Sequence, residues 1–461
     1  MEKETLRKLF AVFEDQEFNQ KLASLVMPIA LQQFMLAVVS ASDAIMLNLI
    51  SQDKMSAVSL ATQITFVENL FLTAMTIGLS MLAAQYWGKK DVKAVERIFA
   101  YVLKITAAVC FVFFIASLAC PRLIMGVLTN EPVLIEGGAE YLRIVSPSYL
   151  LTGISQVCLC VLKNCGRAKK ASLISSVCMI GNLFLNLVLI LGLWVFPRLE
   201  IAGAAMATTI ARGAEVLWCA AALSKEGRLK LRIRNFLKND KVLCRDFWKY
   251  TAPVLGNEIV WGIGFTMYSV IMGHLGSDAV AANSVAGIVK NLVCCLCLGL
   301  GSGGGIMVGN ELGAGRLKQA GDYGDRLCVL SVLVGILSGI FLLVLRPLIL
   351  SVAALNDIAT GYLNGMLLVC TYYMIGKSVN STTISGIFCA GGDSKFGFLC
   401  DTIVMWCISV PLGCFSAFVI KLPVIVVYFI VSLDEIIKLP AVYIHYKKYR
   451  WVKNLTMKEE I

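Results

Sequence analysis

The chain has 461 residues, of which 58% are hydrophobic and 15% are charged, and its mean hydropathy is +0.77. A soluble domain has about 45–50% apolar and about 25% charged residues, so this composition is typical of a membrane protein. It excludes a disordered chain, which needs low hydrophobicity. It also excludes a secreted disulfide scaffold, because only 17 residues are Cys and most lie in apolar runs. The net charge of +11 is better explained by loop topology than by nucleic-acid binding, so we expect no nucleic-acid partner.

The chain contains twelve mostly apolar stretches, each long enough for a membrane-crossing helix, which takes about 20 residues. We therefore predict an all-α membrane protein with twelve transmembrane helices in two six-helix, pseudo-symmetric halves, residues 1–223 and 250–461. Residues 224–249 carry nine Lys and Arg and form a predicted cytoplasmic linker. The twelve predicted spans are roughly 23–50, 57–85, 98–119, 138–162, 172–194, 202–223, 251–274, 280–308, 327–350, 362–388, 397–420 and 423–445.

The positions of Lys and Arg predict the orientation of these spans. The termini and the even-numbered loops together hold 30 Lys and Arg, whereas the opposite loops hold 6. Basic residues accumulate on the cytoplasmic side of membrane proteins. We therefore expect a multi-pass protein of the inner or plasma membrane with both termini and the linker in the cytoplasm.

The two predicted halves resemble each other at a constant offset of 225 residues. This offset places Pro28 on Pro253 and Gln33 on Glu258. It also places the segment Gln85-Tyr-Trp-Gly88 on Asn310-Glu-Leu-Gly313. Because each half has an even number of spans, the repeats share one orientation, and a cavity is expected between them.

Several segments, taken in order, are similar to one transporter family. The first span reads Pro28 followed by Asp43-Ala-Ile-Met, and the fifth reads Asn182-Leu-Phe-Leu-Asn186. The seventh reads Pro253-Val-Leu-Gly-Asn-Glu258. Over nearly its whole length the chain resembles the MATE (multidrug and toxic compound extrusion) family. The resemblance implies export of organic cations in exchange for H⁺ or Na⁺. Asn186 departs from the family, where Asp is frequent at this position.

Asp43 is the first candidate for ion coupling. A carboxylate in a poorly solvated site gains affinity for protons, and with neutral oxygens around it can hold Na⁺. Asn182 and Asn186 are four residues apart and share one helix face, and Thr208 could add a hydroxyl. The resemblance implies that these groups meet Asp43 inside the first half. The alternative is a polar cluster that holds helices together.

Two further acids lie deep in the second half. Glu258 is predicted to bind a substrate cation or a proton, or alternatively to pair with Lys290 or Lys377. Asp401 is predicted to belong to the same site or to form an ion pair at the inner rim. Ionisable residues inside a bilayer usually face a cavity or a partner. Pro28 and Pro253 are predicted helix hinges, because proline kinks a helix.

Other residues inside the spans are expected to be structural. We predict that they form ion pairs or contacts between helices rather than a site. These residues are Glu68, Arg212, Glu215, Lys290, Asp434, Glu435 and Lys438.

No motif predicts enzymatic chemistry. Gly376-Lys377-Ser378 has Thr371 where a phosphate-binding loop needs its first glycine. With only two His in the chain and no zinc-type Cys spacing, we expect no metal site. The prediction is therefore a secondary antiporter, not an enzyme, without a cofactor other than the transported H⁺ or Na⁺.

The expected partners are small organic cations and the lipid bilayer, and we expect a monomer. Competition between ion and substrate would supply the coupling. A flippase for lipid-linked precursors, or an exporter of an unknown metabolite, is the alternative function. A flippase needs a strongly basic cavity, whereas only five Lys and Arg lie within the spans. A channel does not require repeated halves with paired prolines, so their presence favours a transporter. A membrane enzyme has the least support.

Overall fold

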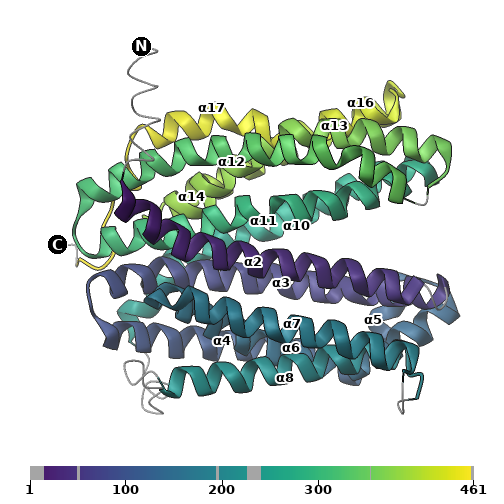
Figure 1. Ribbon diagram of the computed structural model, residues 1–461, viewed down its shortest axis with the longest axis horizontal. Helices are drawn as coiled ribbons and strands as arrows, with labels where there is room; N and C mark the ends of the chain where they lie inside the picture. The colour runs from purple at the N-terminus through teal and green to yellow at the C-terminus, as the bar shows by residue number, and fades with distance from the viewer. Residues whose placement is uncertain (1–14, 49–51, 194–196, 226–239, 354, 458–461) are drawn as a thin grey trace. The chain divides into compact units, whose positions relative to one another are not determined.

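The computed structural model describes the chain except residues 1–14, 49–51, 194–196, 226–239, 354 and 458–461 (Figure 1). Helices make up nearly all of the described residues, and no strand occurs among them. The helices before residue 226 are α2 (Gln16–Asn48), α3 (Gln52–Gly88), α4 (Val92–Ala119), α5 (Pro121–Leu128), α6 (Pro132–Leu162), η1 (Lys163–Arg167), α7 (Ala168–Leu191) and α8 (Glu200–Lys225). Those after residue 239 are α10 (Lys241–His274), α11 (Ser277–Gly313), α12 (Leu317–Val352), α13 (Asp357–Asn380), η2 (Ser381–Phe388), α14 (Ser394–Thr402), η3 (Ile403–Ser409), α15 (Val410–Cys414), η4 (Phe415–Val419), α16 (Val424–Val431) and α17 (Asp434–Tyr446).

The all-helical prediction is confirmed for the described residues, and the described part of each predicted span is mainly helical. Nine helical stretches among these residues are long and apolar enough to cross a membrane. One of the nine, Pro132–Leu191, contains both α6 and α7, which are separated by non-helical backbone at Cys165 and Gly166. The count of twelve membrane crossings therefore stays a prediction.

Two predicted spans are absent from these nine stretches. Helix α8 carries the charged residues Arg212 and Glu215 at its centre. The range 423–445 is broken into α16 and α17, each too short to span alone. Helix α5 lies where the sequence predicts only a connection, and α10 begins at Lys241, inside the predicted linker.

Contacts divide the chain into two compact units. The N-unit comprises Phe34–Ala83 and Asp91–Phe247, and the C-unit comprises Met1–Gln33, Ala84–Lys90 and Trp248–Ile461. In the N-unit, α6 packs against α4 and α8, and α7 packs against α8. In the C-unit, α13 packs against both α11 and α12. The boundaries 1–223, 224–249 and 250–461 stay predictions.

The predicted repeat has a counterpart in the packing within the C-unit. A Cβ atom on Gly88 would overlap the carbonyl oxygen of Asn310, and a Cβ on Gly313 would overlap that of Gln85. These are the pairs that the offset of 225 residues makes equivalent. The ends of α3 and α11 therefore cross in mutual backbone contact, which only glycine permits at these two positions.

The segment after α17 packs into the same end of the C-unit. Trp451 is fully buried and its ring stacks on Tyr446, with 5.5 Å between ring centroids. The Gln85 side chain donates to the carbonyl oxygen of Ala390 at 2.7 Å and accepts from the Leu455 N–H at 2.6 Å. A buried amide with its hydrogen bonds made stabilises a unique arrangement. The carboxy-terminal segment is thus an integral part of the C-unit.

The interruption between α16 and α17 places acids at a helix start. Ser432 and Leu433 form the turn, and Asp434 and Glu435 lie in the first turn of α17. The amino end of a helix carries partial positive charge and favours carboxylates. Interrupted helices of this kind can expose ion-binding groups inside a membrane protein.

Candidate functional site

The described part of the predicted ion-coupling group lies in the N-unit. Asn186 Nδ2 donates to Asn182 Oδ1 at 3.3 Å, and both side chains are buried on α7. Thr208, on the packed helix α8, donates to the Ala204 carbonyl of its own helix at 3.0 Å. Asp43 belongs to α2, but its side chain lies outside the described residues. The meeting of Asp43 with the two asparagines stays a prediction.

Three other charged side chains inside the N-unit are paired or buried. Arg212 Nη1 lies 2.9 Å from Glu215 Oε2, and Glu215 is fully buried. This confirms the prediction that Arg212 and Glu215 are pairing groups. Glu68 is also buried, beside Cys110 and within electrostatic reach of Arg212.

The C-unit contains a larger group of charged side chains on five helices, which we name the charge network. Its acids outnumber its bases by four to three, and all of its members lie within helices of the C-unit. The network comprises Glu258 of α10, Lys290 of α11, Lys377 of α13, Asp401 of α14, and Asp434, Glu435 and Lys438 of α17.

Lys438 is the central cation of the charge network. Its Nζ lies 2.9 Å from Asp401 Oδ1 and 3.5 Å from Glu435 Oε2. The Lys438 side chain is only 3% exposed. A buried charge requires such partners, because an unpaired charge in an apolar interior is very costly. Of the two predictions for Asp401, the geometry therefore matches an ion pair.

Glu435 is held from two sides by different groups. Asn380 Nδ2 donates to Glu435 Oε2 and to the Glu435 carbonyl oxygen, each at 2.7 Å. Lys377 Nζ lies 3.3 Å from the other carboxylate oxygen, Oε1. Lys377 and Asn380 are three residues apart, so they face the same neighbour from α13.

Glu258 differs from the paired acids. It is half-buried, and no direct ion pair or hydrogen bond of its carboxylate occurs among the residues that the structure describes. It lies within electrostatic reach of Lys377 and Asp401. On the next turn of α10, Trp261 stacks on Phe265 with 5.5 Å between ring centroids. Helix α10 therefore presents a carboxylate and an aromatic face one turn apart.

The remaining lysine of the network has an aromatic partner. Lys290 Nζ lies 4.7 Å from the centroid of the Tyr373 ring, and it is within electrostatic reach of Asp434. Asp434 is buried, and Lys438 lies one turn after it on α17. These contacts place every lysine of the network beside an acid or an aromatic ring.

The two predicted hinge prolines lie inside continuous helices. Pro28 is in the interior of α2 and Pro253 in the interior of α10, five residues before Glu258. Proline removes one backbone hydrogen bond of a helix and weakens it locally. The hinge role of both prolines stays a prediction.

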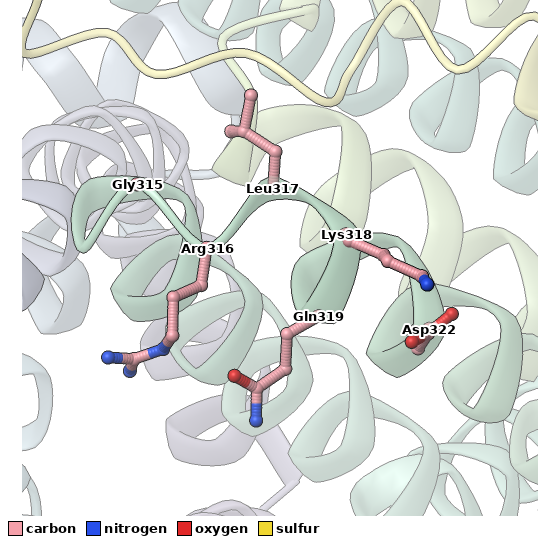
Figure 2. Close-up of a pocket in the computed structure, with 6 residues that line it drawn as sticks. All are labelled: Gly315, Arg316, Leu317, Lys318, Gln319 and Asp322. Atoms are coloured by element: carbon pink, nitrogen blue, oxygen red, sulfur yellow. The ribbon is translucent and has the colours of Figure 1, made fainter.

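A surface hollow of about 650 Å³ lies at the turn between α11 and α12 (Figure 2). None of its lining residues belongs to the charge network, and Arg316 on its wall is held by Glu311 of α11. This hollow is therefore separate from the candidate site. Its lining residues are Gly315, Arg316, Leu317, Lys318, Gln319 and Asp322.

The sequence did not reveal every member of the site. Glu435 and Lys438 were predicted to be structural groups, and Lys377 was considered only as a possible partner of Glu258. Trp261 and Asn380 were not singled out as site residues. A signal for the lysines existed, since Lys290, Lys377 and Lys438 are three of only five basic residues within the predicted spans. Asn380 had no such signal, because an amide in an apolar run is common.

Comparison with known proteins agrees with the family resemblance of the sequence. The MatE family model matches residues 28–188 and 253–415. The uncharacterized transporter YisQ of Bacillus subtilis is 24% identical, over 89% of this chain and 90% of that protein. A probable multidrug resistance protein NorM of Bacillus cereus is 25% identical, over 87% of this chain and 89% of the relative.

Solved structures share the fold. A crystal structure of MATE in complex with MaL6 matches with a TM-score of 0.86 and 14% identity, over 94% of this chain and 96% of the other. A MOP superfamily transporter from Pyrococcus furiosus, described as having a binding pocket of reverse polarity, also has a TM-score of 0.86 and 14% identity. That match covers 96% of this chain and 97% of the other.

Proposed function

The chain belongs to the MatE family, and on that premise we propose that it is a secondary antiporter that exports organic cations in exchange for H⁺ or Na⁺. Members of this family are multi-pass membrane transporters of drugs and toxic compounds. The proposal extends this to the substrate charge, the coupling ion, and a cytoplasmic location of both termini.

The observation that carries the proposal is the pair formed by Glu258 and Trp261. An aromatic face attracts organic cations, by about 2 kcal/mol or more once water is excluded. A carboxylate on the neighbouring turn adds charge attraction. Asp401 and Glu435 are engaged by Lys438 and Lys377, and Asp434 is buried. This leaves Glu258, which is half-buried, as the acid for a cation from solution.

The coupling ion is proposed to bind in the N-unit. Asp43 would carry the charge, and the amides of Asn182 and Asn186 with the Thr208 hydroxyl would add neutral oxygens. Such oxygens suit Na⁺, whereas a carboxylate alone suits a proton. Binding of the ion would favour the state that releases substrate, as reciprocal coupling between two sites requires.

The contacts of the three network lysines count against a flippase for lipid-linked precursors. An acidic headgroup needs a basic side chain that is free to bind it. Lys377 and Lys438 are held by carboxylates, and Lys290 lies over Tyr373. We therefore retain export of cations as the proposed function.

The test is efflux of a fluorescent cationic dye from cells that produce the protein. The proton and sodium gradients are collapsed separately with selective ionophores. Loss of efflux with only one ionophore identifies the coupling ion. Efflux that persists when both gradients are collapsed would contradict antiport.

A further inference from the structure

The position of Lys377 resembles that of a bound substrate. Its Nζ lies 5.7 Å from the centroid of the Trp261 ring, within the range of a cation–π contact. Trp261 follows Glu258 by three residues, so both lie on one face of α10. The Lys377 ammonium also contributes to the electrostatic environment of Glu258. The Lys377 ammonium therefore already occupies the aromatic face of Trp261, on which an organic cation is proposed to bind.

Glu435 is a second partner for the positive charge of Lys377, besides the Trp261 ring. Its Nζ is already 3.3 Å from Glu435 Oε1. Asn380 occupies the other carboxylate oxygen, Oε2, at 2.7 Å, and thereby keeps Oε1 directed to Lys377. A small movement of the lysine toward Glu435 would free Trp261 without leaving an unpaired charge.

Lys377 also differs from Lys438 in its surroundings. The side chain of Lys377 is 22% exposed, whereas that of Lys438 is 3% exposed and is held by two carboxylates. Lys438 alone already serves both Asp401 and Glu435. Asp401 and Glu435 therefore do not depend on Lys377 alone. Glu258 has Lys377 as its nearby cation, and a substrate cation beside Glu258 would replace it.

The charge of the network sets a limit on its ligand. Its four acids and three lysines leave one net negative charge when all are ionised. A ligand with one positive charge would make the network neutral, while a ligand with two would leave an excess charge in a poorly solvated site. Excess charge in such a site is costly.

We propose that Lys377 is a built-in cation that competes with the substrate for the Trp261 face and restricts the site to singly charged cations. The inference rests on the proposed function, and it names the substrate charge and the residue that selects it. Substrate binding moves Lys377 toward Glu435, and substrate release lets it return.

The test compares two ligands that share one ring system. Ethidium carries one positive charge, and propidium carries a second on its side chain. Both are titrated by fluorescence against the purified full-length protein in lipid nanodiscs, as wild type, Lys377→Met and Lys290→Met. Lys290→Met is the matched control, because it removes the same charge from the same network but leaves Trp261 and Glu435 untouched.

The wild type is expected to bind ethidium more tightly than propidium. Lys377→Met should shift the affinity ratio toward propidium by about tenfold or more, because one positive charge within about 10 Å has been removed. Lys290→Met makes the same change in the net charge of the network, so any shift that it shares with Lys377→Met reports that charge. Its own shift should stay below about threefold, because its ammonium lies on Tyr373 and not on Trp261. An equal shift in both variants would overturn the role of the Trp261 face. A ratio in Lys377→Met equal to that of the wild type would overturn the proposal. So would weaker binding of both ligands, which would make Lys377 a substrate ligand or a brace.

A second variant covers the case in which Lys377→Met does not fold. Lys377→Met combined with Glu435→Gln removes both partners and keeps the net charge of the network. It should bind ethidium more tightly than the wild type, because the competitor for Trp261 is gone. Unchanged or weaker ethidium binding in this variant would refute competition.

The same titrations separate this inference from the proposed function. If the wild type binds neither ethidium nor propidium, the proposed cation site fails and the inference fails with it. If the wild type binds ethidium and Glu258→Gln does not, the cation site stands. An unchanged ratio in Lys377→Met then refutes the role of Lys377 alone.

Discussion

Replacement of Lys438 by Met is expected to destabilise the protein more than any other single change in the charge network. Methionine keeps a similar side-chain length and removes the charge. Lys438 serves Asp401 at 2.9 Å and Glu435 at 3.5 Å. Both carboxylates, at 10% and 3% side-chain exposure, would lose their shared cation.

The expected magnitude follows from the burial of the three groups. Removing one partner of a buried ion pair costs about 3–5 kcal/mol, because the remaining charge stays buried without compensation. Asp401 would lose its paired cation, whereas Glu435 would keep Lys377 at 3.3 Å and Asn380 at 2.7 Å, so we expect about the middle of this range. Asp401→Asn should cost less, since Lys438 retains Glu435 at 3.5 Å.

The assay is thermal unfolding of the purified protein in one detergent, followed by intrinsic fluorescence for the wild type, the two single variants and the double variant. Lys438→Met should have the lowest apparent Tm. The double variant Asp401→Asn with Lys438→Met should regain part of the loss, because coupled groups deviate from additivity by about 0.5–3 kcal/mol. An apparent Tm for Lys438→Met equal to that of the wild type, or strictly additive losses in the double variant, would refute the assigned pairing.

Four further outcomes are expected. Trp451→Ala should destabilise the protein by about 3–5 kcal/mol, measured as a lower unfolding temperature, since it empties a fully buried site; full stability would show that the carboxy-terminal segment is not packed as described. Gly313→Leu should abolish folded protein in size-exclusion chromatography because its Cβ would overlap the Gln85 carbonyl, whereas Gly315→Ala at the following turn should give folded protein. Asp43→Asn should abolish ion-driven dye efflux at equal membrane abundance, and normal efflux would remove Asp43 from coupling. A single cysteine at position 235, in a background without accessible native cysteines, should resist an impermeant thiol reagent in intact cells, and labelling would reverse the predicted topology.

The helices were predictable from the sequence because length and hydropathy alone determine which segments can lie in a bilayer. The interruption of the last predicted span was not predictable in the same way. Val424–Val431 is a strongly apolar run, and Ser432 and Leu433 carry no proline or glycine signal. Lys377 and Asn380, which hold Glu435, lie on α13, so no signal within residues 423–445 could have indicated these contacts.

The candidate site was only partly predictable for a related reason. Glu258 and Asp401 stood out because acids are rare in apolar spans. The difference between them, one acid unpaired and the other held by Lys438, arises from the packing of α14 against α17. Spacing along the chain carries no information about such contacts between distant helices. The repeat, by contrast, correctly indicated the equivalence of Gly88 and Gly313, because both positions must admit a neighbouring backbone.

The central claim is that Glu258 binds the transported cation, and direct binding of ethidium to purified wild type and Glu258→Gln tests it most closely. Asp401→Asn serves as the control, since that acid is already paired with Lys438. Loss of a charged partner is expected to weaken binding by about 10- to 100-fold in Glu258→Gln, with a change of less than about threefold in Asp401→Asn. Equal affinities of the wild type and Glu258→Gln for ethidium would contradict the account.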